Sequence, residues 1–151
     1  MAKLSAEARQ GFWQRPGTFG IVGNFEGPSK LSWKLLEQCQ KDGISAVPVN
    51  PELTEVLGVA VVSDPAQIPS LAGIVCVRLD PYATEAVEKA AELGVPVWLS
   101  INAASSVSRA AAERTDVDIV DGACPLMYLG AGSYHAFHRT VAKVFGDGSP
   151  G

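Results

Sequence analysis

The sequence lacks the excess of basic residues that is typical of proteins that bind nucleic acids or anionic membranes. Its 12 Lys and Arg residues are outnumbered by 16 Asp and Glu residues, which gives a net charge of -4. A chain of this charge does not attract a polyanion over a broad face. We therefore expect no nucleic-acid partner, and any anionic ligand must be held by a few local donors.

Long hydrophobic runs are also missing. No apolar stretch of the sequence approaches the ~20 residues that cross a bilayer. The first residues, Met1 to Leu4, lead into a polar stretch and do not form a signal peptide. We expect a cytoplasmic protein with no membrane partner.

Cysteine and histidine are scarce, and this limits the catalytic chemistry. The three cysteines, Cys39, Cys76 and Cys124, are odd in number and far apart, as expected of reduced thiols in the cytoplasm. His135 and His138 follow Cys124 at helical spacing, but three such residues are an unspecific pattern for a metal or Cys-His site. No pair of carboxylates stands out either. We expect no metal and no catalytic residue, and a binding protein in preference to an enzyme.

What the sequence does contain is a regular alternation of strand and helix patterns. At 151 residues with 47% hydrophobic side chains, it fits one compact domain, residues 1–146, followed by a loose tail, 147–151. Alternation of this kind predicts a doubly wound, mostly parallel α/β sheet in three layers, the Rossmann-like architecture of NAD(P)-binding domains. The strands are expected at 18–22, 46–49, 59–62, 73–79, 96–101 and 118–120, and terminal helices at 6–13 and 134–145.

Two further helices have recognisable starts. Asp80 is expected to cap the first of them, with Pro81 at its first helical position. Asn102 is expected to cap the second, which carries Val107, Ala110 and Ala111.

In an open sheet of this type, a ligand lies outside the carboxyl ends of the strands. Gly20, Gly23 and Gly27 follow the first strand, with a spacing that differs from the dinucleotide motif GxGxxG. They fit a tight turn and a phosphate loop equally well. Lys30 and Ser32 begin the next helix, whose free N–H groups would face the crevice.

The end of the second strand bears on the choice of ligand. A carboxylate at this place suits the ribose diol of NAD, whereas this chain has the neutral Asn50. An uncharged residue fits the phosphorylated ribose of coenzyme A or NADP better. Alternatively, Asn50 and Pro51 simply end the strand as a turn, with Glu52 nearby.

Arg78 is a charge at the end of an otherwise apolar strand, and a buried arginine needs a partner. Either Asp80 or a ligand phosphate would satisfy it, and the sequence slightly favours the salt bridge.

Four stretches of the chain resemble the CoA-binding domain family, small Rossmann-like proteins related to the N-terminal domain of the succinyl-CoA synthetase alpha subunit. The resemblance covers about residues 19–128, and its most specific parts are GISAVPVNP at 43–51 and VDGACPLMY at 120–128. PVWLSI at 96–101 and LGVAVVSDPAQIP at 57–69 are similar to further family segments. The resemblance implies coenzyme A or an acyl-CoA as ligand, and no ligase activity.

The resemblance also implies where the ligand lies. The pyrophosphate would meet the first loop and the adenosine the end of the second strand. Phe25 stands where the family has a small residue, so its ring is expected to fill part of the phosphate loop. The residues that the resemblance places at the ligand are Gly23, Asn24, Phe25, Lys30, Ser32, Val49, Asn50, Pro51, Val77, Arg78, Ser100 and Asn102.

Two other functions are compatible with the sequence. One is an NADP- or NAD-binding oxidoreductase domain, although nothing in the chain supplies a proton donor or a substrate domain. The other is a scaffold of the same shape that binds no nucleotide and acts through a partner protein or as a homo-oligomer.

Overall fold

The structure is a computed structural model, and it describes residues 11–100, 103–121 and 123–129. The expected helix at 134–145, the tail at 147–151 and most of the expected N-terminal helix lie outside these residues. No helix in the described ranges is both long enough and apolar enough to span a membrane.

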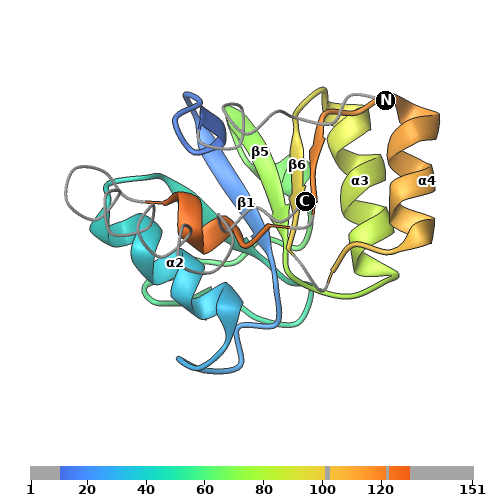
Figure 1. Cartoon of the computed structure of the whole chain (residues 1–151). Coiled ribbons are helices and arrows are strands. Elements are labelled where there is room, and N and C mark those ends of the chain that lie inside the picture. The colour runs from blue at the N-terminus through green and yellow to red at the C-terminus, as the bar shows by residue number, and fades with distance from the viewer. Residues whose placement is uncertain (1–10, 101–102, 122, 130–151) are drawn as a thin grey trace, which may run out of the picture.

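A single parallel sheet forms the centre of the protein (Figure 1). Its strands run in the order β2-β1-β5-β6-β7, and every neighbouring pair is parallel. The strands are short apolar segments, as expected where helices cover both faces, which confirms the predicted fold class. Their bounds are β1 Thr18–Val22, β2 Ala46–Val49, β5 Leu71–Cys76, β6 Val97–Leu99 and β7 Ile119–Val120.

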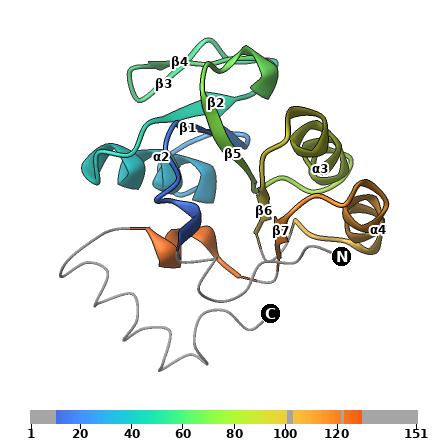
Figure 2. The same ribbon diagram turned by 90° about the horizontal axis from the view of Figure 1, so that it is seen from above.

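Helices cover the two faces of this sheet unequally. Helix α2 (Leu31–Lys41) lies on one face, and α3 (Tyr82–Leu93) and α4 (Ser106–Thr115) lie side by side on the other (Figure 2). The connections also contain two 3-10 turns, η1 (Pro65–Gln67) and η2 (Pro125–Tyr128). The three predicted layers are therefore present.

The sheet separates two hydrophobic cores. The core on the α2 side is rich in aromatic rings and includes Phe12, Trp13, Phe19 and Trp98. The indole N–H of Trp98 donates to the Ala123 carbonyl at 3.0 Å, so this large ring is buried without an unsatisfied donor. The core on the other side is built from small and aliphatic side chains, chiefly of β5, α3 and α4.

The strand expected at 59–62 is divided. Residues of β3 (Glu55–Val56) and β4 (Val59–Ala60) form a separate antiparallel hairpin beside β2 (Figure 2). The turn between them, Leu57-Gly58, has φ angles of 51° and 77°, as a tight two-residue turn requires. Only Val62 reaches the sheet, where it forms a parallel bridge with Val49.

Both predicted helix starts need correction. Pro81, not Asp80, is the residue before α3, and the Asp80 carboxylate accepts the N–H of Thr84. Ser105 caps α4, because its side chain accepts the N–H of Ser108 in a reciprocal capping box. Asn102 lies outside the described residues.

The later start of α4 also changes its buried face. Ser108, Ala111 and Ala112 are buried, whereas Val107 is 60% exposed. These three positions follow an i, i+3, i+4 spacing, which places them on one side of the helix. Val107 therefore lies on the solvent side of α4.

Candidate functional site

Two clefts open at the carboxyl ends of β1, β2 and β5. After β1 the chain crosses to β2 on one side, whereas β5 pairs on the other, so strand order reverses at this point. The first cleft has a volume of about 350 Å³ and the second about 300 Å³. Arg78 and Tyr82 line both of them, and therefore stand between the two spaces.

The loop after β1 owes its shape to Gly23. A Cβ atom on this residue would lie 2.3 Å from the Cβ of Ser32 and 3.2 Å from Cγ2 of Val77. No side chain fits there, so the glycine lets β1 and the start of α2 approach closely. Gly27 in the same loop has open space around its Cα.

Phe25 turns away from the clefts. Its φ of 49° is in the left-handed region, and its backbone N–H donates to Oγ of Ser32 at 3.0 Å. The ring is 4% exposed and belongs to the core on the α2 side. The expectation that this ring fills the phosphate loop was therefore wrong, since the core takes it up.

The start of α2 is open to an anion. Lys30 occupies the N-cap position without a side-chain hydrogen bond, and no acidic residue stands in the first turn. The exposed N–H groups of a helix start carry partial positive charge and attract anions. Asn24, Lys30, Leu31 and Ser32 line the first cleft at this end.

Asn50 has a structural task. Its Nδ2 donates to the Gly23 carbonyl at 2.9 Å and its Oδ1 accepts the N–H of Glu52 at 2.7 Å. The side chain is 4% exposed and lines neither cleft. Asn50 thus ends the strand as a turn, which was one of the two interpretations of the sequence. A carboxylate at this position would leave the Gly23 carbonyl without this donor. Its neighbours Val49 and Pro51 line the second cleft.

Arg78 is not paired with Asp80. Its guanidinium carbon lies 3.7 Å from the centroid of the Tyr82 ring, a cation–π contact. Within the described residues Arg78 forms no ion pair. The salt bridge that the sequence slightly favoured is absent, and the half-buried cation faces the two clefts.

Asp80 is engaged by hydroxyl and amide donors instead. Its Oδ2 accepts the hydroxyl of Ser105, and its Oδ1 accepts the N–H and hydroxyl of Thr84 at 2.9 and 2.6 Å. The bonds from Ser105 and then Thr84 hold the pKa of this carboxyl below its usual value. Asp80 lines the first cleft as a fully partnered anion.

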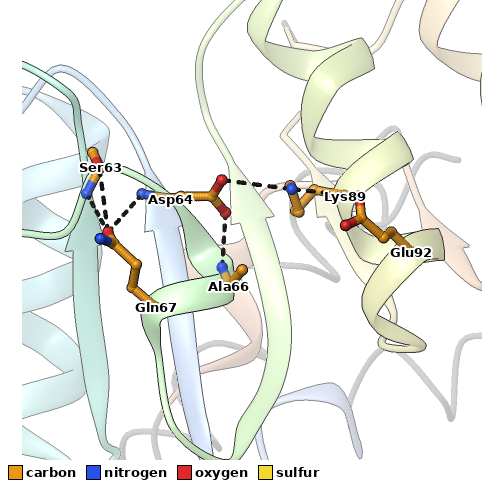
Figure 3. A network of polar contacts seen from close by, with 6 residues as sticks. All are labelled: Ser63, Asp64, Ala66, Gln67, Lys89 and Glu92. Atoms are coloured by element: carbon orange, nitrogen blue, oxygen red, sulfur yellow. Dashed lines mark hydrogen bonds and ion pairs between the residues drawn. The ribbon is translucent and has the colours of Figure 1, made fainter.

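Sequence reasoning missed a polar network that joins η1 to α3 (Figure 3) and from which Ser63, Asp64 and Lys89 line the second cleft. The Gln67 side-chain oxygen accepts the backbone N–H groups of Ser63 and Asp64 at 3.0 and 3.2 Å. Nζ of Lys89 on α3 lies 3.5 Å from Oδ2 of Asp64 and 3.4 Å from Oε2 of Glu92. The spacing of Asp64 and Gln67, typical of a capping box, was the available signal.

The remaining expected site residues are Val77, Ser100 and Asn102. Val77 lines the first cleft. Ser100 is 5% exposed, donates its N–H to the Cys76 carbonyl at 3.1 Å and lines neither cleft. Asn102 is outside the described residues.

Sequence reasoning also missed Asp121, a buried carboxylate at the end of β7 that pairs with Arg109 at 3.1 Å.

The buried thiols are unsuited to nucleophilic chemistry. Burial raises the pKa of Cys39 and of Cys76 to about 12, so both are protonated at neutral pH. Cys124 is half-buried, while His135 and His138 lie outside the described residues. Within the described part of the chain no His, Cys, Asp and Glu side chains gather as a metal site would require.

Comparison with known proteins agrees with this geometry. The family model of the CoA binding domain matches residues 17–130. No curated protein matches the sequence.

Several solved structures share the fold. A hypothetical protein from Pyrococcus horikoshii OT3 has a TM-score of 0.74 at 23% identity, over 83% of this chain and 89% of its own. A conserved hypothetical protein from Pyrococcus furiosus has a TM-score of 0.67 at 24% identity, over 73% and 97%. The dinucleotide forming acetyl-coenzyme A synthetase 1 of Ca. Korarchaeum cryptofilum has a TM-score of 0.62 at 15% identity, over 81% of this chain and 30% of the synthetase.

Proposed function

The chain belongs to the CoA-binding domain family, and from this premise we propose that it binds coenzyme A or an acyl-CoA across the two clefts. We further propose that residues 1–146 form one domain whose task is to hold this ligand, without catalysis of its own. The geometry of the first cleft, of the second cleft and of Arg78 between them supports the proposal.

The first cleft is suited to the pyrophosphate. Its wall includes the uncapped start of α2, whose amides and partial positive charge favour an anion. Lys30 stands at this helix start and adds a full charge that is exposed to solvent. Ser32 is held in place by its contact with Gly23 and by the N–H of Phe25, and its hydroxyl hydrogen is left to donate.

The second cleft is suited to the adenosine. Val22, Val49 and Pro51 give it an apolar side at the ends of β1 and β2. Tyr82, the first residue of α3, also lines this cleft. A flat, largely apolar base gains most from such surroundings, whereas polar groups at the rim orient the sugar.

One observation carries the proposal: Arg78, which has no carboxylate partner among the described residues, presents its guanidinium to both clefts at the point where strand order reverses. The N–H groups of such a guanidinium are available to an anion that enters the clefts, and the planar fork suits a phosphate. A ligand that runs from one cleft to the other would bring its phosphates past this group. Coenzyme A, with phosphates between an adenosine and an extended arm, has that shape.

Thermal unfolding in the presence of four nucleotides tests the proposal. Coenzyme A and acetyl-CoA should raise the melting temperature, while NAD and NADP should leave it unchanged. At 100 times its dissociation constant a ligand stabilises a protein by about 2.7 kcal/mol, which is about 5–10 °C for a domain of this size. A rise with NADP or NAD alone would identify an oxidoreductase domain. If none of the four nucleotides raises the melting temperature, the protein is a scaffold that acts through a partner protein.

Mass spectrometry supplies an independent test. The protein purified without added nucleotide and sprayed under native conditions should carry a mass equal to coenzyme A or one acyl-CoA. The mass would also identify the acyl group. Recovery of a nicotinamide dinucleotide in place of coenzyme A would contradict the proposal.

A further inference from the structure

Arg78 and Asp80 have opposite charges and lie two residues apart on the loop after β5, and both line the first cleft. They nevertheless form no ion pair within the described residues. An aspartate this close is the obvious competitor of any ligand phosphate for the guanidinium. The interactions that keep Asp80 elsewhere therefore bear directly on whether the cleft can bind an anion.

Donors from two helices hold the Asp80 carboxylate. Thr84, in the first turn of α3, donates its N–H and its hydroxyl to Oδ1 at 2.9 and 2.6 Å. Ser105, which caps α4 and lies 25 residues further along the chain, donates its hydroxyl to Oδ2. Oδ1 is held locally by its own loop and helix, so the contact with Ser105 is the one that reaches across the site.

We propose that Ser105 is a positioning residue of the anion site, which holds Asp80 so that the guanidinium of Arg78 stays available to a ligand phosphate. This inference rests on the proposed function, because it requires Arg78 to meet a phosphate. Without the Ser105 hydroxyl, Oδ2 loses its partner and is free to pair with Arg78, which lines the same cleft. The pair then presents less positive charge to the cleft, and a phosphate must displace the carboxylate to bind.

Ser105 also caps α4 through its exchange of hydrogen bonds with Ser108, so the loss of its hydroxyl weakens the helix as well. Ser108 separates the two effects. The change Ser108→Ala removes the partner side chain of the capping box without touching Asp80. It is the matched control for Ser105→Ala.

Calorimetric titration of the full chain with coenzyme A tests the proposal. We expect Ser105→Ala to raise the dissociation constant roughly tenfold, the factor that corresponds to 1.4 kcal/mol. Ser105→Thr, which keeps the hydroxyl, and Ser108→Ala should stay within about twofold of the unchanged protein. Equal weakening by Ser105→Ala and Ser108→Ala would overturn the proposal, since helix capping would then explain the effect.

A double-mutant cycle gives the most specific result. In an Asp80→Asn background no carboxylate is left to pair with Arg78, so Ser105→Ala should change the dissociation constant by less than about twofold. A structural effect of Ser105 would persist in that background. The role given to Ser105 is contradicted if Ser105→Ala still weakens coenzyme A binding tenfold in the Asp80→Asn background. It is also contradicted if the Ser105→Ala single variant binds coenzyme A as tightly as the unchanged protein.

Two further measurements separate this inference from the proposed function. If the unchanged protein does not bind coenzyme A, or if Arg78→Ala binds it equally well, the proposed function or its use of Arg78 fails. Independently of any ligand, the Nε–H signal of Arg78 in nitrogen-15 spectra should shift on Ser105→Ala and not on Ser108→Ala. An unchanged Arg78 signal would overturn the positioning role even where coenzyme A binding is intact.

Discussion

At the scale of single residues, the site depends on side chains that bind other parts of the protein. Gly23 leaves room for Ser32, Asn50 ties the first loop to the end of β2, and Phe25 sends its ring into the core. None of these three acts through a side chain in either cleft. They shape the loop, and Arg78 and Lys30 supply the charge.

Gly23→Ala tests the close approach of β1 and α2. A Cβ atom 2.3 Å from the Ser32 Cβ forces the loop or the helix to move, and overpacking of this kind costs about 1–3 kcal/mol. Urea unfolding should show this loss. Gly27→Ala in the same loop is the control, since it meets open space, and an equal loss in both variants would show that loop flexibility and not contact is decisive.

Asn50→Asp tests the donor to the Gly23 carbonyl. The new carboxylate keeps the acceptor for Glu52 but faces a carbonyl oxygen 2.9 Å from the former donor position. We expect a loss of about 1–3 kcal/mol in the free energy of unfolding at pH 7. Asn24→Asp is the matched control, because its Oδ1 only accepts a bond from the N–H of Glu26. A loss as large in that control would point to added negative charge alone.

At the scale of elements, the helix starts differ in how they are satisfied. The 3-10 turn η1 and helix α4 each begin with a capping box, whereas the N-cap residues Lys30 of α2 and Pro81 of α3 make no side-chain cap hydrogen bond. A cap at α2 would occupy amides that face the first cleft. In the proposed function, the anion takes the place of this cap at the start of α2.

Lys30→Ser should have opposite effects on stability and binding. Serine is a strong N-cap residue, so the variant should gain about 0.5–1 kcal/mol in unfolding free energy. The same change removes a charge and fills the free amides, so coenzyme A should bind at least about tenfold more weakly by calorimetry. Lys34→Ser, an exposed change one turn further into α2, should neither stabilise the protein nor weaken coenzyme A binding to a similar extent. Tighter binding by Lys30→Ser would place the phosphates elsewhere.

At the scale of the whole molecule, the sheet separates two cores, and the candidate site lies at the carboxyl ends of its strands. The aromatic core on the α2 side supports the first loop, and the aliphatic core supports the start of α3. A thiol is buried in each: Cys39 in the first core and Cys76 in the second. These two groups report on the opening of the whole fold.

In a Cys124→Ser variant, the remaining thiols should react with a disulfide reagent only when the protein unfolds. Burial raises the pKa of both thiols to about 12, so in the folded protein they are protonated at pH 8 as well as shielded from the reagent. Saturating coenzyme A should slow the labelling further, because it stabilises the folded state alone. Labelling of the folded protein as fast as of urea-unfolded protein would contradict the burial of both groups.

The sequence by itself determined the architecture. The alternation of short apolar runs with helical patterns, and glycine and proline at their ends, depend on neighbours a few residues apart, so periodicity reveals them. The parallel sheet, the edge that carries the clefts, and the family segments followed from this information. Arg78 was also identified as a charge in need of a partner.

Only the tertiary structure decided which partner each polar side chain has. Asn50 meets Gly23 from 27 residues away, and Asp80 meets Ser105 from 25 residues away. A hydrogen bond depends on distances of a few tenths of an ångström between such segments, and sequence spacing does not contain them. For the same reason the salt bridge to Asp80 was wrongly favoured: proximity along the chain suggested it, but donors brought by folding were closer in space.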